Sequence, residues 1–182
     1  MYELDGKQLK VFAQALTSIS RIGSFVFIST APNDLKISTV NASKSAFALF
    51  TFNNSFFLKS GAIPESVIKL HVKPIVHLFR QNNNLELLNT CSVSVNNDRF
   101  VIKLNCKHGI TKTHSFTYQD SEIVNAIYSN DTPNRFVSPP KALNSVLQTF
   151  HNCMHVTLKT SPYSFSISNS FQNSNDGFSF FN

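Results

Sequence analysis

Residues 104–118 read LNCKHGITKTHSFTY, and the side chains after Gly109 alternate in an unusual way. One face of the predicted strand carries Ile110, Lys112, His114, Phe116 and Tyr118. The opposite face carries only Thr and Ser. Neither face is uniformly apolar, although a strand that buries one face normally alternates apolar and polar residues. The alternation therefore predicts a strand without identifying what it pairs with.

The composition is that of an ordinary globular protein with a weak basic bias. The 182 residues are 42% hydrophobic, enough for one domain or for one domain and part of another. The net charge is +6 and the pI is near 9.3, which favours an acidic partner such as nucleic acid. Only 14% of residues are charged and no Lys/Arg block occurs, so such a partner would meet dispersed cations brought together by the fold.

Cysteine usage and hydropathy indicate a reduced compartment and no membrane association. Cys91, Cys106 and Cys153 are odd in number and widely spaced, and we recognise no signal peptide. No apolar run approaches the roughly 20 residues that cross a bilayer. Disulfides and a membrane partner are not expected.

Periodicity predicts helices and short strands in alternation. A helical spacing of apolar residues covers 7–19, and a second helix is expected to begin near Pro74, since proline suits a first helical turn. Alternation and turn residues predict strands at 1–4, 25–29, 35–40, 45–52, 90–95, 100–106 and 110–118.

The polar segment 119–135 indicates a connector, after which the pattern begins again. A strand at 134–137, a helix at 141–150 and strands at 155–159 and 163–168 are predicted there. The helix starts lie about 134 residues apart, so we expect an internal repeat. The predicted domains are 1–118 and 136–182, and the second would hold only the first half of the repeat.

Each predicted helix combines an apolar stripe with a basic or amide stripe. The polar stripes are Lys7, Lys10 and Gln14; Lys73, His77 and Arg80; and Lys141, Ser145 and Gln148. Any one of them could simply be a solvated face. Equivalent stripes in a repeat could instead line one surface facing a phosphate backbone.

Several segments carry a resemblance to a known family. They are Ser18–Gly23 (SISRIG), Thr39–Phe47 (TVNASKSAF), Phe56–Phe57, Leu104–His114 (LNCKHGITKTH) and Gln119–Asp120. In this order they resemble the Rad-nine subunit of the heterotrimeric nine-one-one DNA-damage checkpoint clamp. The resemblance implies an α+β fold of the DNA clamp (PCNA-like) type, here one complete domain plus the first half of a second.

The resemblance also implies roles for individual residues. Three such subunits close a ring whose helices line the hole. The DNA-facing residues would be Lys10, His77, Arg80 and Gln148, with Lys7, Lys73 and Lys141 nearby on the same faces. The subunit interface would use Ile110, Lys112, His114 and Phe116 on an edge strand.

Partners and location are implied in the same way. They are two other checkpoint-clamp subunits, double-stranded DNA bound without regard to sequence, and an ATP-dependent clamp loader. Checkpoint kinase activators and repair enzymes would dock near the connector, and the protein would be nuclear. The family's phosphorylated tail is absent from these 182 residues. A chain ending there is expected to assemble poorly.

Other classes of function were weighed against a clamp subunit. One is a homotrimeric replication-type clamp, and another is an interaction module without DNA contact. An exonuclease acting from the 3′ end needs a two-metal carboxylate set, but the ten acidic residues are scattered. His151, Cys153 and His155 are close together but lack a second ligand pair at zinc spacing. We therefore expect no catalytic residues, metal or cofactor.

Overall fold

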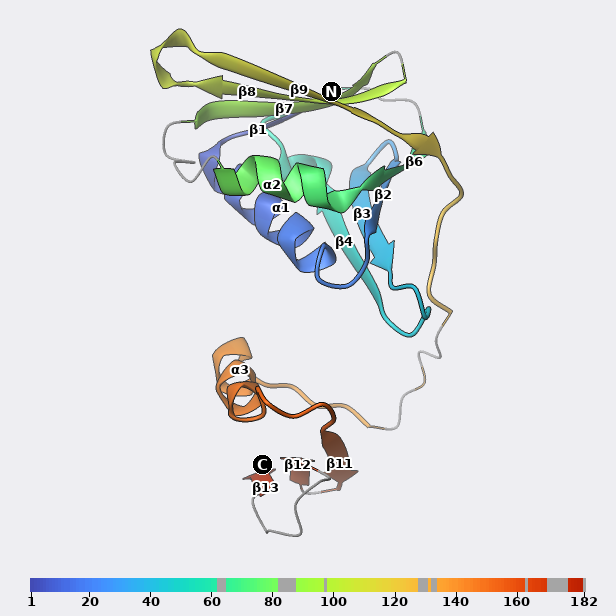
Figure 1. The fold of residues 1–182 in the computed structure, drawn as a ribbon, viewed down its shortest axis with the longest axis vertical. Coiled ribbons are helices and arrows are strands. Elements are labelled where there is room, and N and C mark those ends of the chain that lie inside the picture. The colour runs from blue at the N-terminus through green and yellow to red at the C-terminus, as the bar shows by residue number, and fades with distance from the viewer. Residues whose placement is uncertain are drawn as a thin grey trace. The chain divides into compact units, whose positions relative to one another are not determined.

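The computed structural model describes residues 1–61, 65–81, 88–96, 98–127, 131, 134–162, 164–169 and 177–181 (Figure 1). Its contacts divide the chain into two compact units, Met1–Ala126 and Ile127–Asn182. The expected α+β class is confirmed by the mixture of helices and antiparallel sheets in both units. Among the described helices, none is long and apolar enough to span a membrane.

The first unit contains two helices and two five-stranded antiparallel sheets. The helices are α1 (Gly6–Ile19) and α2 (Val72–Gln81). One sheet has the order β5-β1-β7-β8-β9, formed by Lys59–Ser60, Tyr2–Leu4, Leu88–Asn96, Arg99–Cys106 and Thr111–Thr117. The other has the order β10-β6-β2-β3-β4, formed by Gln119–Asp120, Ser66–His71, Phe25–Thr30, Asp34–Val40 and Phe47–Asn53.

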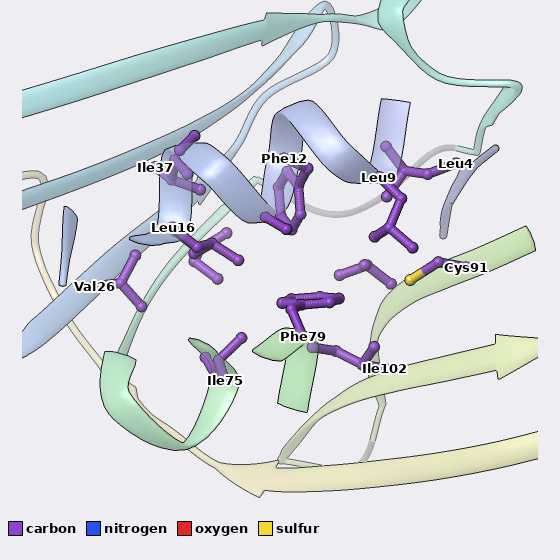
Figure 2. Close-up of a cluster of buried hydrophobic side chains, with 14 of the residues drawn as sticks. Leu4, Leu9, Phe12, Leu16, Val26, Ile37, Ile75, Phe79, Cys91 and Ile102 are labelled. Carbon is purple, nitrogen blue, oxygen red and sulfur yellow. The ribbon is translucent and has the colours of Figure 1, made fainter. Parts of the chain in front are cut away.

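The core of the first unit lies where the two helices meet the inner faces of the sheets. Figure 2 shows side chains from both helices and both sheets pointing toward one another, with Phe12 of α1 facing Phe79 of α2. Phe12 is 1% exposed and Ile102 is fully buried. Burying a side chain of this size stabilises the fold by roughly 1.5–3 kcal/mol, so this cluster fixes how α1 and α2 sit on the sheets.

A capping box starts α1. The Asp5 carboxylate accepts a 2.8 Å hydrogen bond from the backbone N–H of Gln8, and the Gln8 side chain accepts one of 2.9 Å from the backbone N–H of Asp5. Two N–H groups that the helix itself leaves unpaired are thereby satisfied. The helix therefore begins at Gly6, directly after the first strand.

The second unit contains α3 (Pro140–Thr149) and a three-stranded antiparallel sheet. The sheet has the order β11-β12-β13, formed by Thr157–Ser161, Ser164–Ser168 and Gly177–Phe181. Ile167 is 1% exposed, and the rings of Phe136 and Phe165 stack with centroids 4.0 Å apart. By contrast, Leu147 of α3 is 44% exposed, so the helix keeps part of its apolar stripe in solvent.

The structure confirms most of the predicted elements and corrects others. The predicted strand at 134–137 is wrong, because these residues form neither helix nor strand. The second helix begins at Val72, two residues before Pro74, and the strand predicted at 45–52 runs from Phe47 to Asn53. Strands β5, β6 and β10 were not predicted, and β13 covers the strand start expected from the resemblance near 178–181. The first residues of the predicted connector form β10, which pairs with β6.

Candidate nucleic-acid interface

The polar face of α1 points away from the core. Lys7, Lys10 and Gln14 are exposed. Leu9, Phe12 and Leu16, which alternate with them along the helix, are buried. The stripe predicted for this helix is therefore a solvent-facing surface in the described structure.

The same division occurs on α2. Lys73, His77 and Arg80 are exposed and follow one another at i, i+4 and i+7, which places them on one helix face. The other side of the helix buries Ile75 and Phe79. α1 and α2 pack against each other, and the exposed side of each helix carries basic residues.

A basic groove lies between the end of α1 and α2. It has a volume of about 530 Å³ and is lined by Ser20, Arg21, Lys73, Pro74, Val76, His77 and Arg80. No acidic residue is among these lining residues. The groove thus gathers cations beside the apolar side chains of Pro74 and Val76, a suitable surface for a phosphate group.

Arg21 is the lining residue that the sequence analysis missed. It follows α1, and the backbone N–H groups of Arg21 and Ile22 bond to the oxygens of Ser18 and Ile19 at 3.2 and 2.9 Å. This tight turn carries the exposed Arg21 side chain back beside α2. The SISRIG segment contained this arginine, but helical periodicity ends before it.

The remaining predicted DNA-facing residues lie elsewhere. Lys7 and Lys10 are exposed on α1 but are not among the residues lining the groove. Lys141 and Gln148 are exposed on α3, in the second unit. The described structure therefore brings together Lys73, His77 and Arg80, while the roles of all seven residues stay predictions.

The predicted interface strand is an edge strand. β9 pairs with β8, and the described residues place no strand on its other side. Lys112, His114 and Phe116 lie opposite Leu104, Ile102 and Phe100, so this face of β9 continues the inner, core-facing side of the sheet. Ile110 precedes β9 and is 56% exposed, and the Thr and Ser residues form the outer face.

The start of the connector continues along the edge of the second sheet, next to β6. The backbone N–H of Ser121 donates a 3.0 Å hydrogen bond to the oxygen of Val67. Nearby, the Lys69 ammonium lies 4.3 Å from the centre of the Phe25 ring and 5.9 Å from that of Phe27. A cation over aromatic rings makes this surface apolar with a positive centre.

The possible metal ligands are dispersed in the part of the chain that the structure describes, and one thiol belongs to the core. No cluster of three His, Cys, Asp or Glu side chains able to hold a metal occurs there. Burial raises the pKa of the Cys91 thiol to about 12, because the surrounding apolar residues disfavour the thiolate. Cys91 is thus a core residue.

The family model described as Rad9 matches residues 12–180, which run through both units. The chain belongs to the Rad9 family. The Rad9 relatives include the cell cycle checkpoint control protein Rad9 of Drosophila melanogaster, 27% identical over 83% of this chain and 34% of its own length. The DNA repair protein rad9 of Schizosaccharomyces pombe is 24% identical over 82% of this chain and 44% of its own length. The chain therefore spans between a third and a half of these curated relatives.

Solved structures confirm the clamp fold expected for a Rad9 chain. PCNA from Thermococcus kodakaraensis superimposes with a TM-score of 0.71 at 9% identity, covering 99% of this chain and 72% of that one. A chain of the PCNA2–PCNA3 complex from Sulfolobus tokodaii gives 0.69 at 12% identity, covering 98% and 71%. The correspondence extends through the second unit, as expected for a complete first clamp domain followed by part of a second.

Proposed function

We propose that this chain is one subunit of a heterotrimeric, ring-shaped checkpoint clamp that encircles double-stranded DNA. Membership in the Rad9 family and the clamp fold support this proposal. The observation that supports the DNA contact is the basic groove, whose lining includes Arg21, Lys73 and Arg80 and, among the described residues, no acidic side chain. The work of the subunit is structural and recruiting, and it is not a catalyst.

The groove accounts for how such a ring would hold DNA. A few exposed cations give weak phosphate contacts that are independent of sequence and sensitive to salt. Weak contacts let a ring slide, whereas a dense basic surface would hold it in place. The low charged fraction of 14% fits a sliding contact better than a fixed one.

The proposed function also predicts where the other subunits and the recruited proteins bind. The two further clamp subunits bind at the ends of the domains, one of them through β9. An ATP-dependent loader opens and closes the ring on DNA in the nucleus. Checkpoint kinase activators and repair enzymes dock beside the connector, where Lys69 and Phe25 present an apolar surface with a positive centre.

A topological assay tests this function. The chain is assembled with the other clamp subunits of its organism and loaded onto closed circular DNA by the loader and ATP. A ring that encircles DNA is retained on the circle at high salt and is released when the circle is cut, because it slides off the ends. Lack of retention would instead support an interaction module without DNA contact, and retention of this chain alone would support a homotrimeric clamp.

A further inference from the structure

His114 carries a buried atom that the chain itself leaves unsatisfied. Its Nε2 is buried and has no hydrogen-bond partner among the described residues. The residue lies at the centre of β9 and faces the inner side of the sheet opposite Ile102, which is fully buried. Folded proteins keep few such atoms, because a buried polar group without a partner destabilises the fold. The position therefore needs an explanation beyond the packing of the isolated chain.

The place of His114 in the sheet supplies that explanation. β9 is an edge strand with one side free in the described structure, so an added strand would pair along its length. Side chains directly opposite one another in an antiparallel pair have Cβ atoms about 4.5–5.5 Å apart. A residue of an added strand on the inner face would thus lie beside the His114 ring, and Nε2, which the chain's own atoms cover, would meet it once the ring turns toward that edge.

The charge of β9 indicates which side chain an added strand should place opposite His114. The strand reads TKTHSFT, so its ionisable groups are Lys112 and His114, both on the inner face. A carboxylate accepts a hydrogen bond from Nε2–H and also lies favourably near the Lys112 ammonium. Besides β9, the described edge strands of five or more residues are β4, β11 and β13. They read FALFTFN, TLKTS and GFSFF, and neither they nor β9 contain a carboxylate. A second copy of the chain is therefore a poor partner.

We propose that His114 determines partner choice at the β9 edge. Its Nε2–H donates a hydrogen bond to a carboxylate on a strand of a different clamp subunit, whereas the long edge strands described for this chain offer no such carboxylate to a second copy. This inference rests on the proposed function, since it assumes that β9 is a subunit contact. His114 acts as a specificity residue because the unsatisfied atom disfavours any strand without the complementary group.

Substitutions at one position test the inference with two readouts. His114→Leu removes the unsatisfied nitrogen, so the thermal midpoint of the chain alone should stay the same or rise. Its affinity for one of the two other clamp subunits, each purified separately, should fall at least about tenfold, while affinity for the other stays unchanged. His114→Gln restores a side-chain N–H and should recover most of the loss. Ser115→Ala, on the outer face of the same strand, is the control and should change neither readout.

The outcomes separate the inference from the function on which it rests. Unchanged affinity of His114→Leu, equal loss toward both partners, or joint loss of stability and affinity would each overturn the role of His114. If Lys112→Glu weakens assembly and His114→Leu does not, β9 is still a contact and only the role of His114 is wrong. If neither variant changes assembly, the proposed contact through β9 is wrong as well.

Discussion

The Thr39 hydroxyl donates a 2.6 Å hydrogen bond to the backbone oxygen of Phe25, tying β3 to the first residue of β2. Thr39 is completely buried, so this bond lies in the interior of the first unit. The turn between α1 and β2 passes directly over it. A Cβ added at Gly23 would collide with the Thr39 hydroxyl and would lie 2.6 Å from the oxygen of Val40. The turn that positions Arg21 therefore depends on a glycine for space.

Replacing Gly23 with alanine should destabilise the protein. The new methyl group meets backbone as well as a hydrogen-bonded side chain, so neither can move aside cheaply. We expect a loss of about 1–3 kcal/mol in the free energy of unfolding, the usual cost of overpacking a buried site. Urea unfolding followed by circular dichroism measures it. Gly61→Ala is the control, because its nearest atoms lie at an ordinary 3.6 Å. Equal urea midpoints for Gly23→Ala and Gly61→Ala would contradict the predicted collision at Gly23.

Removing cations from the groove should weaken DNA binding in a salt-dependent way. In the assembled heterotrimer, Arg21→Ala combined with Arg80→Ala should lower the slope of log affinity against log salt by about one to two, roughly one per lost phosphate contact. The loss should be the same for unrelated DNA sequences, because phosphates are the groups contacted. Fluorescence anisotropy at several salt concentrations measures the slope.

A matched variant separates the groove from general surface charge. Lys103 is exposed and projects from the outer side of β8, away from the inner face that carries Leu104 and Ile102. Lys103→Ala changes the net charge by one without touching the groove, so its salt slope should equal that of the unaltered protein. An unchanged slope for the groove variant would show that DNA does not contact α2.

Charge reversal on the edge strand should weaken one subunit contact and leave the other intact. Lys112→Glu places a negative charge beside the incoming strand, where we expect a carboxylate, and like charges opposite one another destabilise pairing. Affinity for one partner subunit should fall about tenfold or more by isothermal titration. Lys103→Glu, on the neighbouring strand but the opposite face, should have little effect. Equal weakening of both contacts would mean that the charge acts at long range.

The thiols should differ sharply in reactivity. At pH 8 the Cys91 thiol, with a pKa of about 12, is almost entirely protonated and buried, so it should resist alkylation by iodoacetamide. Cys106 and Cys153 are half-buried and should react first. Because the folded pKa is raised, Cys91 stabilises the fold fully below pH 9, the ordinary thiol value, and this contribution decreases between pH 9 and 12. Mass spectrometry of peptides after timed alkylation gives the order in which the three cysteines react. Early modification of Cys91 would contradict its burial.

Local patterns predicted α1 and α2 well because each of them buries a single apolar stripe. Leu9, Phe12 and Leu16 repeat at helical spacing and are all buried, so the helix at 7–19 could be predicted. β6 was missed because its two sides differ little: Val67 is half-buried outside and Ile68 is buried inside, giving no clean alternation. The strand at 134–137 was wrongly predicted from a short aromatic and β-branched pair that has no strand beside it in the described structure.

Some residues of the candidate site could be predicted from helical periodicity, and others depend on tertiary packing. The exposure of Lys73, His77 and Arg80 followed from the periodicity of α2. Arg21 could not be found that way, because a turn and tertiary packing bring it to α2. Whether Nε2 of His114 has a hydrogen-bond partner depends on the atoms packed around it, and a sequence pattern does not show these contacts.

The two long edge strands described in the first unit are unlike. β4 and β9 are both seven residues long, but β4 contains no charged residue, whereas β9 carries Lys112 and His114. A building block with two different ends has a direction, so it adds neighbours head to tail and not face to face. Head-to-tail addition closes a ring only when the rotation per contact divides a full turn, and otherwise it continues as a helix. The twist between the β4 and β9 edges thus determines whether copies of such a unit form a finite ring or an open filament.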